Sequence, residues 1–343
     1  MKPCFFDLDL NDLSEVLKGY GEPDFRTKQL WQLVYKNLKL SPEAFPAVPK
    51  ELRLKLAENF DFAPVQVLRK VVSQDQRTEK YLFGLQDGKK IEAVLMYYRE
   101  RITICISTQV GCGMNCAFCA TGQMGLTRNL SAGEIAGQVL FFAQELSLTE
   151  KKLSNIVIMG MGEPFHNYDN VMKAIDVINH PDGFQFGERR ITVSTVGLIP
   201  MIEKFTKAKR QINLAISLHA PSNKIREQIL PVNRKYPMEQ LLEACQAYVQ
   251  TTRRRITFEY ALIHGVNDSV ADAAQLAKLL HGMLCHVNLI SLNETKKYAG
   301  KGSPAERAND FRAVLDRAGI PCSIRLKRGV DIGAGCGQLV TQA

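Results

Sequence analysis

The chain has 343 residues, of which 45% are hydrophobic and 23% charged, a composition typical of a soluble globular protein. It lacks an apolar run of about 18 residues and a signal-peptide pattern, so we expect a cytoplasmic protein that makes no membrane contact. The net charge of +9 permits a polyanionic partner such as RNA, although a merely basic soluble protein would show the same excess.

Residues 1–60 show apolar side chains at three- and four-residue spacing, which predicts helices. Two strands are expected at 78–85 and 91–98, joined through a turn at Gln86-Asp87-Gly88. The length allows a small domain beside a larger one, so we place a small N-terminal α+β domain at residues 1–97.

From residue 102 strand-like apolar runs alternate with helical patterns. The strands are expected at 102–107, 155–159, 191–194, 212–218, 256–262, 286–292 and 322–326, and most intervals between them contain helical patterns, as at 132–146, 168–178, 238–249 and 270–280. This alternation predicts an α/β fold with a parallel sheet wrapped by helices, either a partial or full (β/α) barrel or a doubly wound sheet. In each case the chemistry belongs at the C-terminal ends of the strands.

Nine cysteines are present, and they do not space out as a secreted disulfide framework. Cys105, Cys112, Cys116 and Cys119 lie within fifteen residues, and Cys336 lies almost at the C-terminus. The other four, Cys4, Cys245, Cys285 and Cys322, are scattered, and we interpret them as small buried hydrophobic residues.

The segment Cys112-Gly-Met-Asn-Cys116-Ala-Phe-Cys119 carries the strongest chemical signal. Three thiolates at these spacings can bind three irons of a [4Fe-4S] cluster and leave the fourth iron open for a substrate. Zinc is the main alternative, but structural zinc sites usually have four Cys or His ligands, and no second cysteine pair accompanies this one.

This cysteine spacing, with Phe118 before the last cysteine, resembles the signature of the radical-SAM superfamily. The resemblance implies that Cys112, Cys116 and Cys119 hold a [4Fe-4S] cluster, that S-adenosylmethionine binds to the open iron, and that its cleavage gives a 5′-deoxyadenosyl radical.

Four further segments narrow the resemblance to the RNA adenine methyltransferases of this superfamily: Cys105–Cys112, Met159-Gly-Met-Gly-Glu-Pro164, Ser217-Leu-His-Ala-Pro221 and Asp331–Leu339. The match extends from about Glu22 to Leu339. That family methylates carbon 2 of an adenosine in 23S ribosomal RNA, some members also modify tRNA, and a sister group methylates carbon 8.

The resemblance also implies a domain layout and partners. Residues 1–97 would be an RNA-binding accessory domain, 98–328 a partial (β/α) barrel radical-SAM core, and 329–343 a C-terminal catalytic loop. We expect a monomer that acts on 23S rRNA and possibly tRNA, receives electrons from a donor such as flavodoxin, and uses two S-adenosylmethionine molecules per turnover.

Three residues outside the cluster motif match catalytic positions of the family. Cys336, flanked by Gly333, Gly335 and Gly337, would carry a methyl group as a thioether. Glu92 would act as the proton acceptor, and Cys105 would form a disulfide with Cys336 to release the product. On pattern alone, these residues would be a tail cysteine, a solvent-facing strand residue and a core cysteine.

Residues at the expected strand ends would bind S-adenosylmethionine: Gly162, Glu163, Ser194, Ser217, Leu218, His219 and Asn293. Glu163 would pair with the ammonium group. Singly, such residues are often only turn or cap residues. The sequence departs from the family at Ser291, where proline is usual, and at Gly335, where alanine is commoner, so we expect these two loops to differ in shape from those of the family.

Basic residues that could contact RNA occur in several groups: Arg26 and Lys28, Arg189 and Arg190, Lys207 to Arg210, Arg253 to Arg255, and Arg325, Lys327 and Arg328. The sequence does not distinguish carbon-2 from carbon-8 methylation. An RNA-binding zinc protein without catalysis would also account for the charge and the cysteines.

Overall fold

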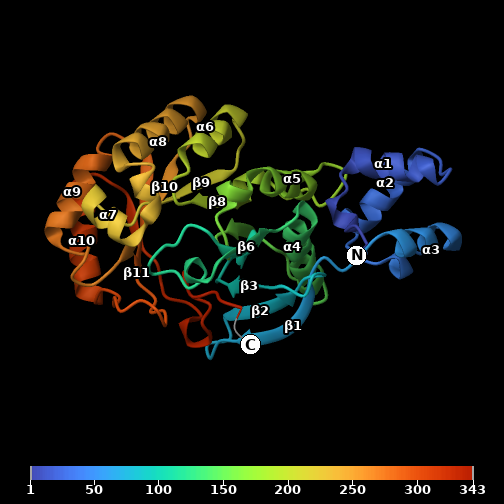
Figure 1. The fold of residues 1–343 in the computed structure, drawn as a ribbon, viewed down its shortest axis with the longest axis horizontal. Coiled ribbons are helices and arrows are strands. Elements are labelled where there is room, and N and C mark those ends of the chain that lie inside the picture. The colour runs from blue at the N-terminus through green and yellow to red at the C-terminus, as the bar shows by residue number, and fades with distance from the viewer. Residues whose placement is uncertain (1, 342–343) are drawn as a thin grey trace.

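The computed structural model describes residues 2–341 as helices on the outer side of one long curved sheet (Figure 1). The ten strands of this sheet run in the order β1-β2-β3-β4-β7-β8-β9-β10-β11-β12. Since β1 and β12 are its two edges, the sheet is open, which confirms the expected α/β fold with a partial barrel.

The first part of the sheet is antiparallel and the rest is parallel. The pairs of β1 (Gln66–Val72), β2 (Thr78–Gly84), β3 (Lys90–Tyr97) and β4 (Ile102–Cys105) are antiparallel. From β4 onward all neighbours are parallel: β7 (Asn155–Ile158), β8 (Ile191–Thr195), β9 (Asn213–Ser217), β10 (Ile256–Leu262), β11 (Cys285–Ser291) and β12 (Cys322–Ile324). A separate antiparallel hairpin joins β5 (Gln109–Cys112) to β6 (Gly125–Asn129).

The helices that connect the parallel strands are α4 (Ala132–Ser147), α5 (Tyr168–Asn179), α6 (Ile199–Ala208), α7 (Asn223–Ile229), α8 (Met238–Thr252), α9 (Val270–Leu280) and α10 (Ala305–Arg317). Serines fix two of their starts. Ser131 and Glu134 form a capping box on α4, as Ser269 and Asp272 do on α9, and both satisfy backbone N–H groups that a helix start leaves free. The four helices expected in this region are confirmed.

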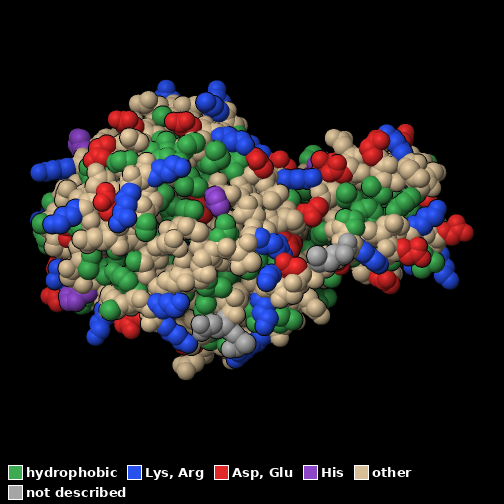
Figure 2. Space-filling view, viewed as in Figure 1, with side chains coloured by type: hydrophobic (Ala, Val, Ile, Leu, Met, Phe, Trp, Pro, Cys, Tyr) green, Lys and Arg blue, Asp and Glu red, His purple; other side chains and the backbone are tan. Residues whose placement is uncertain are grey.

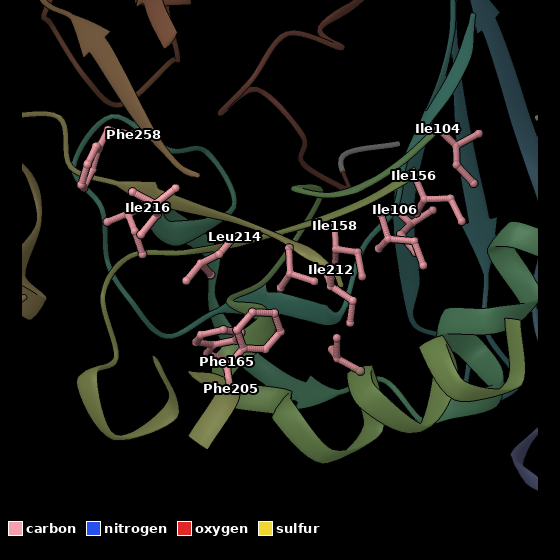
Figure 3. Close-up of a cluster of buried hydrophobic side chains, with 14 of the residues drawn as sticks. Ile104, Ile106, Ile156, Ile158, Phe165, Phe205, Ile212, Leu214, Ile216 and Phe258 are labelled. Carbon is pink, nitrogen blue, oxygen red and sulfur yellow. The ribbon is translucent and has the colours of Figure 1, made fainter. Parts of the chain in front are cut away.

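Alternation along the parallel strands sends apolar side chains outward to the helices. Ile156 and Ile158 of β7 are buried, and Figure 3 shows them in the apolar cluster with Phe165 and Phe205. The intervening Asn155 and Val157 are only partly buried and line cavities inside the curved sheet. The sheet is therefore stabilised mainly from its outer face, and its inner face is left for the site.

Three helices near the N-terminus, α1 (Leu10–Gly19), α2 (Phe25–Trp31) and α3 (Lys50–Asn59), form a unit with its own apolar cluster. Figure 1 shows this unit at one end of the molecule. Strands β2 and β3, which we assigned to the same domain, belong instead to the long sheet, where β3 pairs with β4. A boundary at residue 97 cuts that sheet, so we place the helical unit at residues 2–62 and β1 to β3 with the core.

Five features were missing from the expectations: β1, the β5–β6 hairpin, α6, α7 and α10. Within residues 2–341, no helix is both long enough and apolar enough to cross a membrane.

Candidate active site

The C-terminal ends of the parallel strands open into a cavity of ≈ 150 Å³. Most of the expected site residues meet here. The lining includes Cys112, Cys116, Cys119, Gly162, Glu163, Ser194, Ser217, His219, Asn293 and Cys336. Expected residues from six separate parts of the chain thus converge at the edge where a parallel sheet places its ligands.

The three cluster cysteines lie on one loop whose base is the β5–β6 hairpin. Gly111 at the base has φ +77, and a Cβ there would lie 1.9 Å from the Gly125 carbonyl oxygen, so only glycine permits this close approach. Cys112 and Cys116 are buried, and burial raises the pKa of the Cys112 thiol to about 12. Buried thiols become thiolates readily only beside compensating positive charge, which irons of a cluster provide.

Cys112, Cys116 and Cys119 line one cavity. Three thiolates would fit a [4Fe-4S] cluster, in which each would bind a different iron and the fourth iron would stay open, whereas a structural zinc site usually has four Cys or His ligands.

Glu163 follows β7 in a turn that depends on Gly162. Gly162 has φ +106, and a Cβ there would lie 2.7 Å from the Gln109 side chain. The Glu163 carboxylate accepts hydrogen bonds from the backbone N–H groups of Val196 (2.9 Å) and Phe165 (3.0 Å). Burial nevertheless raises the pKa of Glu163 to about 7. A cationic group in the cavity would therefore stabilise its charged form.

The residues after β8 and β9 line the opposite wall. The Ser194 hydroxyl donates to the Ile158 carbonyl at 3.0 Å. His219 has φ +57, and its Nδ1 accepts from the Ala261 N–H at 2.9 Å, which fixes the ring as an acceptor at that nitrogen. Burial lowers the pKa of His219 to about 3, so the imidazole is neutral. Leu218 is fully buried and is not part of the cavity lining, so only its backbone can contribute.

Asn293 connects the cavity to the C-terminal segment. Its Nδ2 donates to the Cys336 carbonyl at 3.1 Å, while its buried Oδ1 has no hydrogen-bond partner among the described residues. That oxygen can accept from a ligand in the cavity. A Cβ on Gly335 would lie 2.7 Å from the Asn293 amide, so glycine at this position allows the contact.

Cys336 and Cys105 share a second, smaller cavity next to the first. Cys336 lines both cavities and is exposed, whereas Cys105 lies at the end of β4 and is partly buried. Burial raises the pKa of the Cys105 thiol to about 12. Both are free thiols in this structure, and the two cysteines face one space.

Glu92 lies on β3, outside the lining of both cavities. Its buried carboxylate pairs with Lys80 Nζ at 3.0 Å and accepts from the Val340 N–H at 2.8 Å. Lys80 also donates to the Gly333 carbonyl at 3.3 Å. Burial raises the pKa of Glu92, and Lys80 opposes that rise. This pair holds the C-terminal segment on both sides of Cys336.

The same segment crosses the open side of the sheet. Asp331 accepts from the Gln74 N–H at 2.9 Å beyond the end of β1, the Gly337 carbonyl accepts from the Ala120 N–H at 2.8 Å, and the Leu339 carbonyl accepts from Thr121 at 2.7 Å. Residues 329–341 therefore bridge strands β1 to β3 and the cluster loop, which covers the gap between the two edges of the sheet.

Sequence reasoning missed Arg226, which is fully buried behind the site. Its guanidinium donates to the carbonyls of Leu218 (3.2 Å), Val196 (2.6 Å) and Ser217 (3.3 Å) and to Asn233 Oδ1 (2.9 Å). It thus fixes the backbone that follows β8 and β9. A single arginine in a helical pattern gives no sequence signal for this role.

Comparison with known proteins agrees with this geometry. Residues 106–277 match the Radical SAM superfamily. The chain is 45% identical over 333 residues to "Probable dual-specificity RNA methyltransferase RlmN" of Caldanaerobacter subterraneus, with 97% of this chain and 96% of the relative covered. A protein of the same name from Chloroflexus aurantiacus is 45% identical, covering 98% and 92%.

A solved structure extends the likeness to three dimensions. The crystal structure of a radical SAM methyltransferase from Sphaerobacter thermophilus superposes with a TM-score of 0.97 at 47% sequence identity, covering 99% of this chain and all of that one. The open mixed sheet, the three-cysteine loop and these near-full-length relatives lead to one conclusion: the chain belongs to the RlmN family of radical SAM RNA methyltransferases.

Proposed function

We propose that this enzyme methylates carbon 2 of an adenosine in 23S rRNA and in tRNA, through a methylated Cys336. The observation that carries the proposal is the position of Cys336, which lines both the cavity of the cluster cysteines and the space that contains Cys105. A methyl carrier must meet the source of the radical on one side and the base and the resolving thiol on the other.

When bound, the cluster and S-adenosylmethionine supply a radical that can abstract hydrogen from an unreactive carbon. The amino-acid end of S-adenosylmethionine would lie against Gly162 and Glu163, whose raised pKa a cation offsets. Ser194, Ser217, His219, Asn293 and the Leu218 backbone would hold the nucleoside part. We further propose that two S-adenosylmethionine molecules are consumed per turnover, one for the methyl group and one for the radical.

The protein's own residues would complete the reaction. After a hydrogen atom has been taken from the Cys336 S-methyl group, the remaining methylene radical would add to adenine carbon 2. Glu92 would accept the proton that adenine carbon 2 loses, and the one unpaired electron left on the adduct would return to the bound cluster, so that a closed-shell thioether joins Cys336 to the base. Burial raises the pKa of Glu92, which suits a base that works near neutral pH. To reach the substrate, the Glu92 carboxylate must release its hydrogen bond from the Val340 N–H. The Cys105 thiolate then attacks the Cys336 sulfur, the bond from that sulfur to the methylene carbon breaks, the carbon takes a proton, and a disulfide remains.

Mass spectrometry of digested RNA tests the proposal directly. RNA treated with the anaerobically reconstituted enzyme, S-adenosylmethionine and an electron donor such as flavodoxin should contain 2-methyladenosine, identified against authentic 2-methyl- and 8-methyladenosine. Formation of 8-methyladenosine would assign the enzyme to the sister activity. A colourless protein that holds one zinc and methylates nothing would reduce it to an RNA-binding protein.

A further inference from the structure

The inside of the curved sheet contains a third cavity at the opposite, N-terminal ends of the parallel strands. This cavity of ≈ 840 Å³ is lined by the first inward-facing residue of nearly every parallel strand. These residues are polar: Thr103, Asn155, Thr192, Asn213, Thr257, His286 and Ser323. Closed (β/α) barrels fill this layer with branched apolar side chains. A polar, partly exposed layer leaves room and hydrogen-bonding groups for a ligand.

Arginines surround this N-terminal mouth. Arg101, Arg189, Arg253, Arg254, Arg255 and Arg325 line it, and Glu259 is the only acidic residue in the same lining. Arg101, Arg189, Arg253 and Arg255 are exposed. Six guanidinium groups against one carboxylate give a concave surface that attracts phosphates, which arginine binds through its planar fork of donors.

The mouth is continuous with the active site. Met159, Glu259 and Arg325 line both the N-terminal cavity and the cavity of the cluster cysteines, and Met159 and Arg325 also line the space that contains Cys105 and Cys336. Glu259 is buried between them, and its Oε2 has no hydrogen-bond partner among the described residues, with Arg325 Nη1 at 3.7 Å. A free acceptor here suits the amino group of a purine that has passed the mouth.

Contacts of the C-terminal segment narrow two other approaches to Cys336. The C-terminal segment closes the gap between the sheet edges through its contacts with Gln74, Lys80 and Glu92. At the C-terminal side, Gly337 and Leu339 bind the cluster loop at Ala120 and Thr121.

The N-terminal helical unit is a weaker electrostatic candidate for RNA. Residues 1–62 contain nine Lys and Arg against ten Asp and Glu, a net charge of −1. Residues 63–343 therefore carry a net charge of +10, which gives the chain its total of +9. Figure 2 shows both signs intermingled on this unit. Arg26 and Lys28 are also in ion pairs, with Glu22 (3.1 Å) and Asp182 (2.9 Å).

We propose that the substrate RNA binds at the N-terminal mouth of the partial barrel, where the arginines contact phosphates of a single-stranded segment, and that the target adenosine reaches Cys336 through this opening. This proposal rests on the proposed function for the identity of the base. The two ligands would then bind at opposite ends of the parallel strands, S-adenosylmethionine at the C-terminal ends and RNA at the N-terminal ends.

The test measures RNA affinity and methylation on the full-length enzyme with its cluster. The probe is a fluorescein-labelled RNA hairpin with adenosines in its single-stranded loop. The mouth variant combines Arg253→Gln with Arg255→Gln, two exposed residues whose side chains make no hydrogen bond within residues 2–341. The matched control combines Lys297→Gln with Lys301→Gln, two exposed lysines on the C-terminal side beyond β11.

The mouth variant should bind the hairpin at least ~10-fold more weakly. The slope of log affinity against log salt concentration should become less steep by about 1.4, because each of the two lost phosphate contacts to a single strand accounts for about 0.7. The control should bind within about twofold. Cleavage of S-adenosylmethionine in the absence of RNA should be unchanged in both, which shows that the site at the other end is intact. Wild-type affinity in the mouth variant with weakened binding in the control would overturn the proposal and place RNA on the C-terminal side.

A second variant tests the passage itself. Thr257→Trp places a bulky side chain on the inner face of β10 and leaves every arginine of the mouth unchanged in sequence. Hairpin affinity should stay within about threefold, whereas RNA methylation should fall at least ~100-fold, because a displaced base loses its reactive geometry. Methylation at the wild-type rate would exclude the passage. If the wild-type enzyme methylates no adenosine but the mouth variant still binds RNA weakly, the RNA site stands and the proposed reaction fails.

Discussion

Replacement of Arg226 by methionine should destabilise the protein and loosen the cofactor site together. Burial lowers the pKa of Arg226 to about 10, so its guanidinium is charged at neutral pH and donates four hydrogen bonds. Methionine fills a similar volume but leaves the four acceptors without this donor. Each buried acceptor left unsatisfied costs about 1–3 kcal/mol, and the two longer bonds, at 3.2 and 3.3 Å, count least.

We therefore expect Arg226→Met to lower the free energy of unfolding by about 3–5 kcal/mol, the range for removing one member of a buried charged network. Urea denaturation of the cluster-free protein measures this loss. Affinity for S-adenosylmethionine should fall as well, because the carbonyls that Arg226 holds belong to Val196, Ser217 and Leu218 beside the cavity. Arg234→Met, on the exposed surface nearby, is the control and should change stability by less than about 0.5 kcal/mol. A loss below about 1 kcal/mol in Arg226→Met would refute the reasoning.

Four shorter predictions follow from the site. Alanine at Cys112, Cys116 or Cys119 should abolish cluster binding and methylation, since the loop has no spare thiol; iron and sulfide analysis checks it. Cys105→Ala should leave protein covalently attached to RNA on a denaturing gel, and a band that persists after Cys336 is also replaced would move the methyl carrier elsewhere. Gly162→Ala should weaken S-adenosylmethionine binding at least ~10-fold, or about 1.4 kcal/mol, by calorimetry, because its Cβ would clash with Gln109, whereas Gly187→Ala, with open space around it, should not. The fold lowers the pKa of His219 to about 3, so the folded protein loses stability as the pH falls from 6.5 toward 3. His219→Asn keeps an acceptor for the Ala261 N–H but does not titrate. Urea titrations at pH 4.5 should therefore show that this variant avoids an acid-induced loss of ~3 kcal/mol in the free energy of unfolding.

The parts of the site that are local in sequence could be predicted, because their geometry follows from the strand they end. The cluster motif lies on one loop, and Glu163, Ser194 and Ser217 each stand at or just after a strand that the apolar pattern revealed. Parallel strands bring such ends to one edge, so order along the chain was enough to group them.

What the sequence could not provide depends on pairing between distant segments. Strand β1 is exposed at almost every position, so its residues show no alternation, and only its pairing with β2 makes it a strand. Helix α10 did carry a weak signal, since Ala308, Phe311 and Leu315 are its buried residues at helical spacing. The continuation of the sheet across residue 97 could not be predicted for the same reason, because nothing local shows that β3 pairs with β4.

The grouping of the arginines is also a property of register. Arg189 precedes β8, Arg253 to Arg255 precede β10, and Arg101 precedes β4, so each lies near the start of a parallel strand. In the sequence these are three unrelated basic stretches, and only strand order and pairing bring them around one opening. Arg26 and Lys28 differ from these arginines because each is in an ion pair with a carboxylate.

The contrast between rigid strands and the segment that carries Cys336 has a chemical reason under the proposed mechanism. Cys336 must first face the methyl donor and the radical, and then the base and Cys105, so its sulfur has to serve two adjoining cavities. A strand residue points to one side only, whereas a glycine-flanked loop can turn between them. The segment is still held at both ends, at Gly333 by Lys80 and at Val340 by Glu92. Anchored ends with a pliable centre confine the movement to the residues that need it, which is the arrangement that a carrier between two fixed sites requires.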